Sequence, residues 1–225
     1  MKPVQFSIDG KNIECPEGQS ILWAALDHHI YIPNLCALRE KGEPEGACRL
    51  CFVEVEGESL PVTACTTGVK GGMVVHTKGA RALRLARTAF QLMLSNHPVD
   101  CAHCLKSGSC ALQEISKHLG VKLNTKRFKK FLRELPVDET SPVFIYDPNK
   151  CVLCSRCVWL CEKLEPGSIG FAHRGFGRRV SAFGDEPVGL SGCRNRVELA
   201  GICPVGAFVA KDKEHRKKTA KAIGG

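Results

Sequence analysis

Residues 151–161 read CVLCSRCVWLC, and this stretch decides the fold of the last third of the chain. Its cysteines, Cys151, Cys154, Cys157 and Cys161, have the spacing Cys-x2-Cys-x2-Cys-x3-Cys. Iron–sulfur proteins use this spacing to hold a [4Fe–4S] cluster on one tight loop. The stretch therefore predicts a cluster site followed directly by a helix.

The fourth ligand of this site is expected far along the chain. In two-cluster domains with this spacing, the fourth cysteine of each run serves the other cluster, and the second run ends in Cys-Pro. Cys203-Pro204 fits that ending. Counting back, the other ligand positions of the second run hold Cys193, Arg196 and Leu199, so two of them have lost their cysteine. We therefore predict one [4Fe–4S] cluster here, held by Cys151, Cys154, Cys157 and Cys203, with Cys161 and Cys193 as remnants; Cys161 as a local fourth ligand stays open as the rival assignment.

A second set of candidate ligands spans residues 97–110, which read HPVDCAHCLKSGSC. His97 stands ahead of three cysteines, Cys101, Cys104 and Cys110, so four donors fall within fourteen residues. His103 is a competing histidine, but it lies inside the two-residue gap, from where a fourth iron is hard to reach.

A third set of four cysteines lies near the start of the chain, and Gly46 and Ala47 before its second member are small, as close backbone approach to a metal centre requires. Zinc sites usually pair two short Cys-x-x-Cys knuckles, and only one occurs here, although a four-cysteine zinc site remains an alternative. Cys15 has no partner at such spacing and is read as an ordinary thiol. The set comprises Cys36, Cys48, Cys51 and Cys65.

Composition points to metal rather than to disulfides. The chain has 14 cysteines in 225 residues but only 6% aromatic residues, so metal binding can supply folding free energy that a small core does not. The start of the sequence carries no export signal and no apolar run long enough for a membrane span, which favours a reducing, cytoplasmic location. The net charge of +9 counts every cysteine as neutral, and thiolate clusters would offset it. No basic-plus-aromatic module for nucleic acid is recognised.

The hydrophobic pattern predicts an α+β fold. Residues 2–8 and 11–15 alternate around Asp9-Gly10, a hairpin signal. Residues 18–29 read as a short helix, residues 51–56 and 73–77 as strands, and residues 110–119 as a helix that Gly120 ends.

Residues 80–95 are expected to form a longer helix with two distinct faces. Arginines line one face, which is either solvated or a docking surface for an acidic partner subunit. The apolar stripe comprises Leu83, Ala86, Phe90 and Met93, and the arginines are Arg81, Arg84 and Arg87.

These elements and motifs suggest a division into successive parts. The expected parts are residues 1–78, 79–120 and 143–211 for the three sites, with a linker at 121–142 and a basic tail at 212–225.

The three motifs in this order resemble the N-terminal region of the large iron–sulfur subunit of respiratory complex I, and, at this length, the small diaphorase subunit of NAD(P)-linked [NiFe] hydrogenases. The sequence segments that match include Ser95-Asn96-His97-Pro98 and Cys110-Ala111-Leu112-Gln113. The resemblance implies a β-grasp, plant-ferredoxin-like [2Fe–2S] domain around Cys36, Cys48, Cys51 and Cys65. It implies a helical [4Fe–4S] segment with one histidine ligand, His97, and three cysteine ligands, and a degenerate bacterial-ferredoxin-like domain at the end.

By this resemblance the chain relays single electrons and has no active site of its own. The implied partners are a flavoprotein subunit that handles NAD(P)(H), a thioredoxin-like [2Fe–2S] subunit, and hydrogenase small and large subunits. A formate dehydrogenase, an electron-bifurcating complex or an NADH:quinone oxidoreductase module is the alternative setting, and a zinc-stabilised scaffold is a remote one. No flavin-binding or NAD-binding loop is recognised in the sequence.

Overall fold

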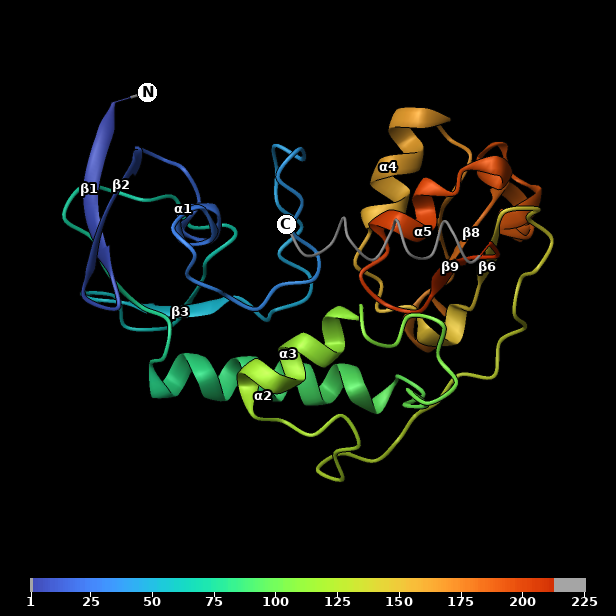
Figure 1. Ribbon diagram of the computed structural model, residues 1–225, viewed down its shortest axis with the longest axis horizontal. Helices are drawn as coiled ribbons and strands as arrows, with labels where there is room; N and C mark the ends of the chain where they lie inside the picture. The colour runs from blue at the N-terminus through green and yellow to red at the C-terminus, as the bar shows by residue number, and fades with distance from the viewer. Residues whose placement is uncertain (1, 213–225) are drawn as a thin grey trace. The chain divides into compact units, whose positions relative to one another are not determined.

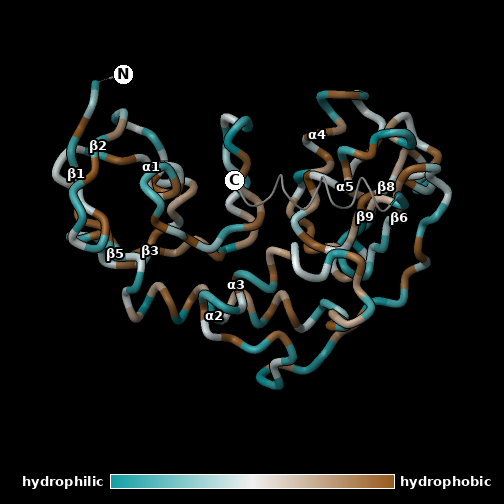
Figure 2. Tube along the Cα trace, in the orientation of Figure 1, coloured by the Kyte–Doolittle hydropathy of each residue, from teal (hydrophilic) through white to brown (hydrophobic). Residues whose placement is uncertain are grey.

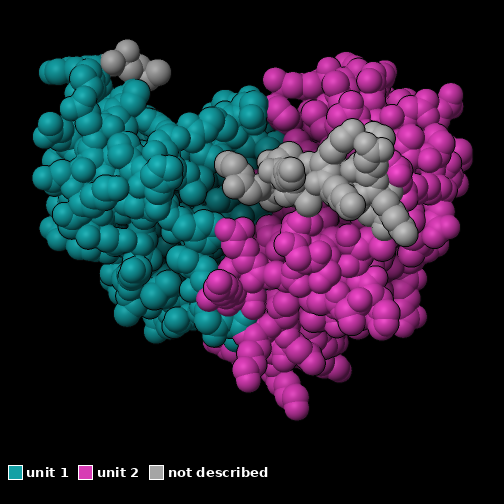
Figure 3. Space-filling view, viewed as in Figure 1, with its two compact units in different colours: residues 1–91, 118–121 teal, residues 92–117, 122–225 magenta. Residues whose placement is uncertain are grey.

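The computed structural model describes residues 2–212, which form two compact units. Among the described residues, unit 1 comprises residues 2–91 and 118–121, and unit 2 comprises residues 92–117 and 122–212 (Figure 3). All but the first residue of the expected basic tail lies outside the described residues. No helix within residues 2–212 is both long enough and apolar enough to cross a membrane.

Unit 1 is built on a five-stranded mixed sheet in the order β2-β1-β5-β3-β4. Figure 1 labels three of these strands, β1, β2 and β3. Strands β1 and β2 form the expected antiparallel hairpin, in which Phe6 faces Ile13. Asp9 and Gly10 have φ of 49° and 80°, the left-handed pair that a two-residue hairpin turn requires. The strands are β1 (Pro3–Ile8), β2 (Lys11–Pro16), β3 (Phe52–Val55), β4 (Val62–Thr63) and β5 (Val74–His76), with β5 parallel to β1 and antiparallel to β3.

Helix α1 (Ile21–Asp27) contributes to the core of unit 1. Ser20 caps it by accepting a hydrogen bond from the Trp23 amide at 3.3 Å. Its side chains Ile21, Leu22, Ala24 and Ala25 are buried in one apolar cluster with side chains of the sheet. The helix is shorter at both ends than the residue range 18–29 expected from sequence.

Helix α2 (Ala80–Ser95) has the bounds that the sequence predicted, and apolar and polar residues alternate around its coil (Figure 2). Glu54, on β3, accepts hydrogen bonds from the Arg81 and Ala82 amides at 2.8 and 3.1 Å and so caps the first turn. The predicted apolar stripe was confirmed at Ala86 and Phe90 and wrong at Leu83 and Met93, which are only half-buried. The fully buried line is Ala82, Ala86, Phe90 and Leu94.

Two of the arginines of α2 donate hydrogen bonds to backbone carbonyl groups of the protein. Arg81 donates to the Ser59 carbonyl at 2.8 Å, and Arg87 Nε donates to the Leu119 carbonyl at 2.9 Å. Leu119 is the last residue of α3 (Ala111–Leu119), which ends before Gly120 as expected. Gly120 adopts a φ of 63°, the left-handed conformation common after a helix.

Unit 2 consists of short elements. Phe208 is the centre of its aromatic core, stacked on Tyr146 at 4.4 Å and edge-on to Phe144 at 5.3 Å. Strand β6 (Phe144–Tyr146) pairs with β9 (Phe208–Ala210), and β7 (Gly170–Ala172) pairs with β8 (Arg179–Ser181), both antiparallel. Besides the end of α2 and most of α3, its helices are α4 (Arg156–Leu164) and α5 (Glu198–Ile202). Its single 3-10 turns are η1 (Pro148–Lys150), η2 (Gly175–Gly177), η3 (Phe183–Asp185), η4 (Val188–Leu190) and η5 (Gly192–Asn195).

The segment expected to be a linker, residues 121–142, contains no helix or strand but is anchored in unit 2 from residue 122 onward. Asp138 and Tyr146 form an isolated antiparallel bridge. The Leu135 amide and carbonyl bond to the Asn149 side chain at 2.9 and 2.8 Å. Arg133 donates to the Cys151 carbonyl at 2.7 Å, which places this segment beside a predicted ligand.

Candidate metal centres

The first cysteine set lies in unit 1, in the loop before β3 and just after β4. Cys36 and Cys48 place their sulfur atoms 3.4 Å apart, and the Cys48 amide donates to Cys36 Sγ at 3.5 Å. Gly46 and Arg49 have φ of 58° and 55°, so the loop around Cys48 turns tightly through left-handed conformations. This turn brings two thiols that are twelve residues apart into contact.

The thiols of the first set are electrostatically coupled. A hydrogen bond with Cys36 lowers the pKa of Cys48 to about 7, and the same bond raises the pKa of Cys36. Cys51 and Cys65 form a matching pair, in which the pKa of Cys51 is raised and that of Cys65 is lowered. The set therefore holds four thiolates only when positive charge is added, and iron would supply that charge.

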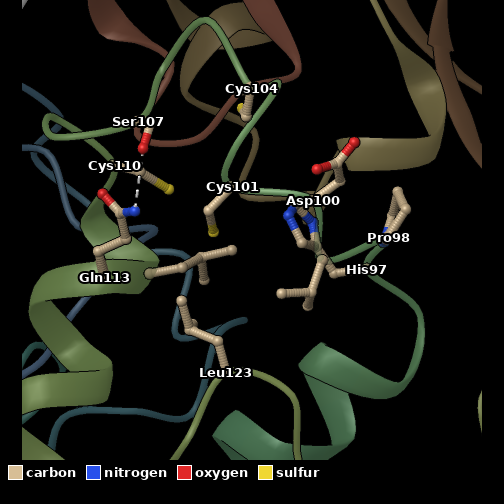
Figure 4. Close-up of a pocket in the computed structure, with 12 residues that line it drawn as sticks. His97, Pro98, Asp100, Cys101, Cys104, Ser107, Cys110, Gln113 and Leu123 are labelled. Carbon is tan, nitrogen blue, oxygen red and sulfur yellow. Dashed lines mark hydrogen bonds between the residues drawn. The ribbon is translucent and has the colours of Figure 1, made fainter.

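The second set lines one pocket in unit 2. His97, Cys101, Cys104 and Cys110 all border it, and Figure 4 shows them around one space together with Asp100, Gln113 and Leu123. The His97 ring is held in a neutral state, because burial lowers its pKa to about 4. Its buried Nδ1 atom has no hydrogen-bond partner within the described residues.

The two histidines near this pocket have different surroundings. The His103 side chain is 84% exposed and its Nδ1 lies 2.9 Å from an Asp100 carboxylate oxygen. His97 is the neutral, buried ring that borders the pocket, and a neutral imidazole is the form that binds metal. These features favour His97 over His103 as the fourth donor.

The third set also lines one pocket of unit 2. Cys151, Cys154 and Cys157 come from the loop before α4 and its first turn, and Cys203 follows α5 directly. Leu153 and Ser155 adopt φ of 55° and 63°, which is uncommon for residues with a side chain, and the Leu153 amide points to Cys151 Sγ at 3.4 Å. The predicted rival ligand, Cys161, does not border this pocket.

The thiols of the third set are strongly biased toward the protonated form. Burial raises the pKa of Cys151 to about 11 and that of Cys154 to about 12, and it raises the pKa of Cys157 well above its ordinary value. Neighbouring thiolates, Cys203 among them, raise these values further. Such a site suits a multiply charged metal centre, which deprotonates its thiol ligands on binding. Within residues 2–212, no three His, Cys, Asp or Glu side chains form a group that could hold a single metal ion.

One short strip of chain, residues 203–207, borders both the second and the third pocket. Cys203, Val205 and Ala207 border the third pocket, whereas Gly206 borders the second. A Cβ atom on Gly206 would lie 2.7 Å from Cys104 Sγ, so this position has no room for a side chain. The Pro204 carbonyl accepts a hydrogen bond from the Ala111 amide at 2.9 Å, which ties the strip to the start of α3.

Two further side chains near these pockets were not singled out from the sequence. Lys106 is buried, and the thiols that interact with its charge are Cys203, Cys110 and Cys104, from both sets. Burial lowers the pKa of its ammonium and those thiolates raise it. Arg133 holds the Cys151 carbonyl, as described above. The only signal for either residue in the sequence is a basic side chain near a cysteine motif, which is too common to assign a role.

Three cysteines lie outside the three sets, one as a free thiol and two in a disulfide. Cys15 is a buried free thiol on β2, consistent with an ordinary core residue. Cys161 and Cys193, which were expected to be remnants of a second ligand set, are joined in a disulfide, although composition had favoured metal binding over disulfides.

Comparisons with known proteins agree with this arrangement. A family model described as a 2Fe-2S iron-sulfur cluster binding domain matches residues 1–80, which contain the first set. A second model, described as the NADH-ubiquinone oxidoreductase-G iron-sulfur binding region, matches residues 87–124, which contain the second set. A solved structure titled as an NAD+-reducing [NiFe]-hydrogenase in the H2-reduced state contains a chain with a TM-score of 0.82 and 31% identity, covering 93% of this chain and 88% of that one. The chain belongs to this family of hydrogenase iron–sulfur subunits, which is homologous to the N-terminal region of the large iron–sulfur subunit of complex I.

Curated relatives of this family are longer. The NADP-reducing hydrogenase subunit HndD of Solidesulfovibrio fructosivorans is 34% identical over 93% of this chain, which spans 36% of that relative. The NADPH-Fe(3+) oxidoreductase subunit alpha of Geobacter sulfurreducens is 35% identical over 95% of this chain, which spans 25% of it. The chain thus spans about a quarter to a third of these relatives. As a family member it has a mixed α/β fold, and its matched domains indicate binding of both [2Fe–2S] and [4Fe–4S] clusters.

Proposed function

We propose that this chain holds three clusters and relays single electrons through them. A β-grasp, ferredoxin-like N-terminal domain would hold one [2Fe–2S] cluster by Cys36, Cys48, Cys51 and Cys65. A helical segment would hold a [4Fe–4S] cluster by His97, Cys101, Cys104 and Cys110, and the C-terminal ferredoxin-like domain a second one by Cys151, Cys154, Cys157 and Cys203.

The observation that carries this proposal is that the twelve predicted ligands lie in three separate groups of four. The four donors of the second set border one pocket and the four of the third set border another. The first set is linked by short contacts and by shared charge effects. Each group matches the ligand number of an iron–sulfur cluster.

When bound, the clusters would supply one-electron redox chemistry, and the protein supplies ligands, burial and fixed charge. The side chains bordering the third pocket include Phe171, Val180 and Phe208, which limit the access of water to that site. Lys106 adds a buried cation near thiols of both [4Fe–4S] sets. Burial and charge are two of the levers that set cluster potentials.

We further propose that the relay connects a flavoprotein subunit that handles NAD(P)(H) with a hydrogenase module in the cytoplasm. A thioredoxin-like [2Fe–2S] subunit and the hydrogenase small and large subunits would be the other partners. The support is the likeness to a chain of an NAD+-reducing [NiFe]-hydrogenase across nearly the whole length. The chain itself would have no active site, so flavin and catalytic metal would come from its partners.

A second setting is a complex I-like module or a dehydrogenase of another substrate. A relative named NADH-ubiquinone oxidoreductase 78 kDa subunit, mitochondrial, from Candida albicans, is 30% identical over 96% of this chain, which spans 29% of it. Metal analysis of the native complex separates these settings, since nickel indicates a hydrogenase, and molybdenum or tungsten a formate dehydrogenase.

Elemental analysis and paramagnetic resonance on the anaerobically isolated native complex test the cluster content. We expect about ten iron atoms per chain, from one two-iron and two four-iron sites. We also expect one [2Fe–2S] and two [4Fe–4S] signals on reduction that are assigned to this chain by ligand substitution. A colourless chain that contains zinc and no iron would reject the relay and support a zinc-stabilised scaffold.

A further inference from the structure

Two of the cysteines outside the predicted ligand sets are bonded to each other. Cys161 lies on α4 and Cys193 on η5, with a sequence separation of 32 and a Cα–Cα distance of 6.4 Å. That distance lies within the range that a disulfide spans. Both residues are fully buried.

By the predicted spacing, these two residues stand at ligand positions of a second cluster. In the two-cluster pattern the fourth cysteine of the first run, Cys161, would have joined the second run at Cys193 and at positions 196 and 199. With the ligands at 196 and 199 replaced, the two remaining thiols have no iron to share. The structure joins them directly.

The other two ligand positions of the second run hold side chains that do not bind metal. Leu199 is fully buried, and Arg196 pairs with Glu165 at 2.5 Å. A Cβ atom on Gly192, next to Cys193, would lie 2.5 Å from Ser168 Oγ. The two replaced ligand positions thus supply apolar packing and an ion pair instead of metal ligands.

We propose that the Cys161–Cys193 disulfide is a covalent staple that has replaced the second cluster of this domain and holds the third site in shape. Cys161 follows Cys157 by four residues, which is about one turn of α4, so the bond fixes the helix that presents a predicted ligand. Cys193 is anchored by its amide, which donates to Ser191 Oγ at 3.2 Å, and its turn leads into α5 and Cys203. The effect on the third site rests on the proposed function, whereas the disulfide itself does not.

The oxidant that forms this bond is a low-molecular-weight disulfide. Exchange during folding converts two thiols and one such disulfide into the Cys161–Cys193 bond and two free small thiols, so the reagent takes up both electrons and both protons. Once the unit has folded, complete burial keeps thiolate reductants away from the bond. This lack of access lets the bond persist among reducing thiols.

Peptide mapping tests the bond itself. The holoprotein is denatured anaerobically at acid pH in the presence of a chelator, alkylated without reductant, and digested with trypsin. We expect a cross-linked pair of peptides, residues 157–163 and 180–194, in which Cys157 is alkylated and Cys161 is bonded to Cys193. Alkylation of both Cys161 and Cys193 overturns the proposal, and so does iron near fourteen atoms per chain, which would mean that a second four-iron cluster is present.

Cluster loss tests the staple. The double variant C161A/C193A should assemble the third [4Fe–4S] cluster anaerobically but lose its resonance signal several-fold faster than wild type in the presence of a chelator. The matched control is Cys15→Ala, which removes a buried thiol from β2 and should lose the cluster at the wild-type rate. Equal rates for the double variant and wild type reject the staple.

The two proposals fail in different ways. A cross-linked peptide pair in a protein without iron would reject the electron relay and leave the disulfide standing. About ten irons together with free Cys161 and Cys193 thiols would reject the disulfide and leave the relay standing.

Discussion

The Lys106 ammonium donates a hydrogen bond to the Ala200 carbonyl oxygen at 3.2 Å, although 94 residues separate the two in sequence. This bond holds a buried positive charge among thiols of the second and third sets. A fixed cation stabilises the reduced, more negative state of a nearby cluster.

Replacing Lys106 by methionine should therefore lower the reduction potential of both [4Fe–4S] clusters. The expected shift is on the order of 50–100 mV, from Coulomb interaction over several ångströms at an effective dielectric constant near 20. Potentiometric titration followed by paramagnetic resonance measures it. Lys117→Met, which removes an exposed lysine, is the control and should leave both potentials unchanged.

The second prediction concerns Gly206, in the strip at residues 203–207 that borders the second and third pockets. Gly206→Ala places a methyl group 2.7 Å from Cys104 Sγ, so either the sulfur or the backbone must move. We expect loss or strong weakening of the [4Fe–4S] signal assigned to the second set, measured as iron content and resonance intensity. Gly170→Ala, whose methyl group meets nothing within 4 Å, should keep full occupancy. Full occupancy in both variants would contradict the placement of Cys104 as a ligand.

The assignment of the histidine ligand can be tested by comparing variants of His97 with a variant of His103. His97→Ala should abolish the second-set [4Fe–4S] signal, whereas His103→Ala should retain it, because His103 is exposed and pairs with Asp100. His97→Cys should restore the cluster at a lower potential, since a thiolate adds negative charge. The opposite pattern would assign the site to His103.

The pairing of ligands in the third set makes a separate prediction. Cys203→Ser should remove that [4Fe–4S] signal, because Cys203 borders the pocket. Cys161→Ser should retain the signal in freshly prepared anaerobic protein, because Cys161 does not border it. Resonance spectra of the two variants at equal protein concentration decide between the predicted pairing and a local Cys161 ligand.

Cluster retention should depend on pH with a definite sign. The third-set thiols take up protons far more readily than exposed ones, because burial raises the pKa of Cys151 to about 11 and that of Cys154 to about 12. Protons compete with iron for these sulfurs, and the competition grows as the pH falls. Loss of absorbance at a fixed concentration of a chelator with pH-independent affinity should therefore be faster at pH 6 than at pH 8. A rate that is flat or rises toward pH 8 would contradict this assignment.

Local rules predicted the regular elements of unit 1 well. Asp9-Gly10 indicated the first hairpin because a two-residue turn with positive φ is specified by its own residues. The bounds of α2 followed from its periodicity, and Ala86 and Phe90 were placed correctly, but Ala82 was missed because a small residue carries little hydropathic signal. The packing of small residues depends on what lies opposite them, and the sequence does not contain that information locally.

The ligand sets could be proposed from spacing because cluster chemistry restricts which cysteines share a site. The Cys161–Cys193 bond could not, because it depends on the tertiary closure of a 32-residue separation. Lys106 was missed for the same reason, since its carbonyl partner is Ala200. In the C-terminal part of unit 2 the regular elements are three to nine residues long, too short for periodicity to define them.

The strip at residues 203–207 has a consequence for the speed of the proposed relay. Gly206 borders the second pocket while Cys203, Val205 and Ala207 border the third, so one short segment of backbone contributes to the lining of both sites. Tunnelling between sites that share this segment requires no opening, diffusion or rearrangement. The rate of electron transfer between these two sites should therefore be insensitive to solvent viscosity. A more viscous solvent should slow only the docking between subunits.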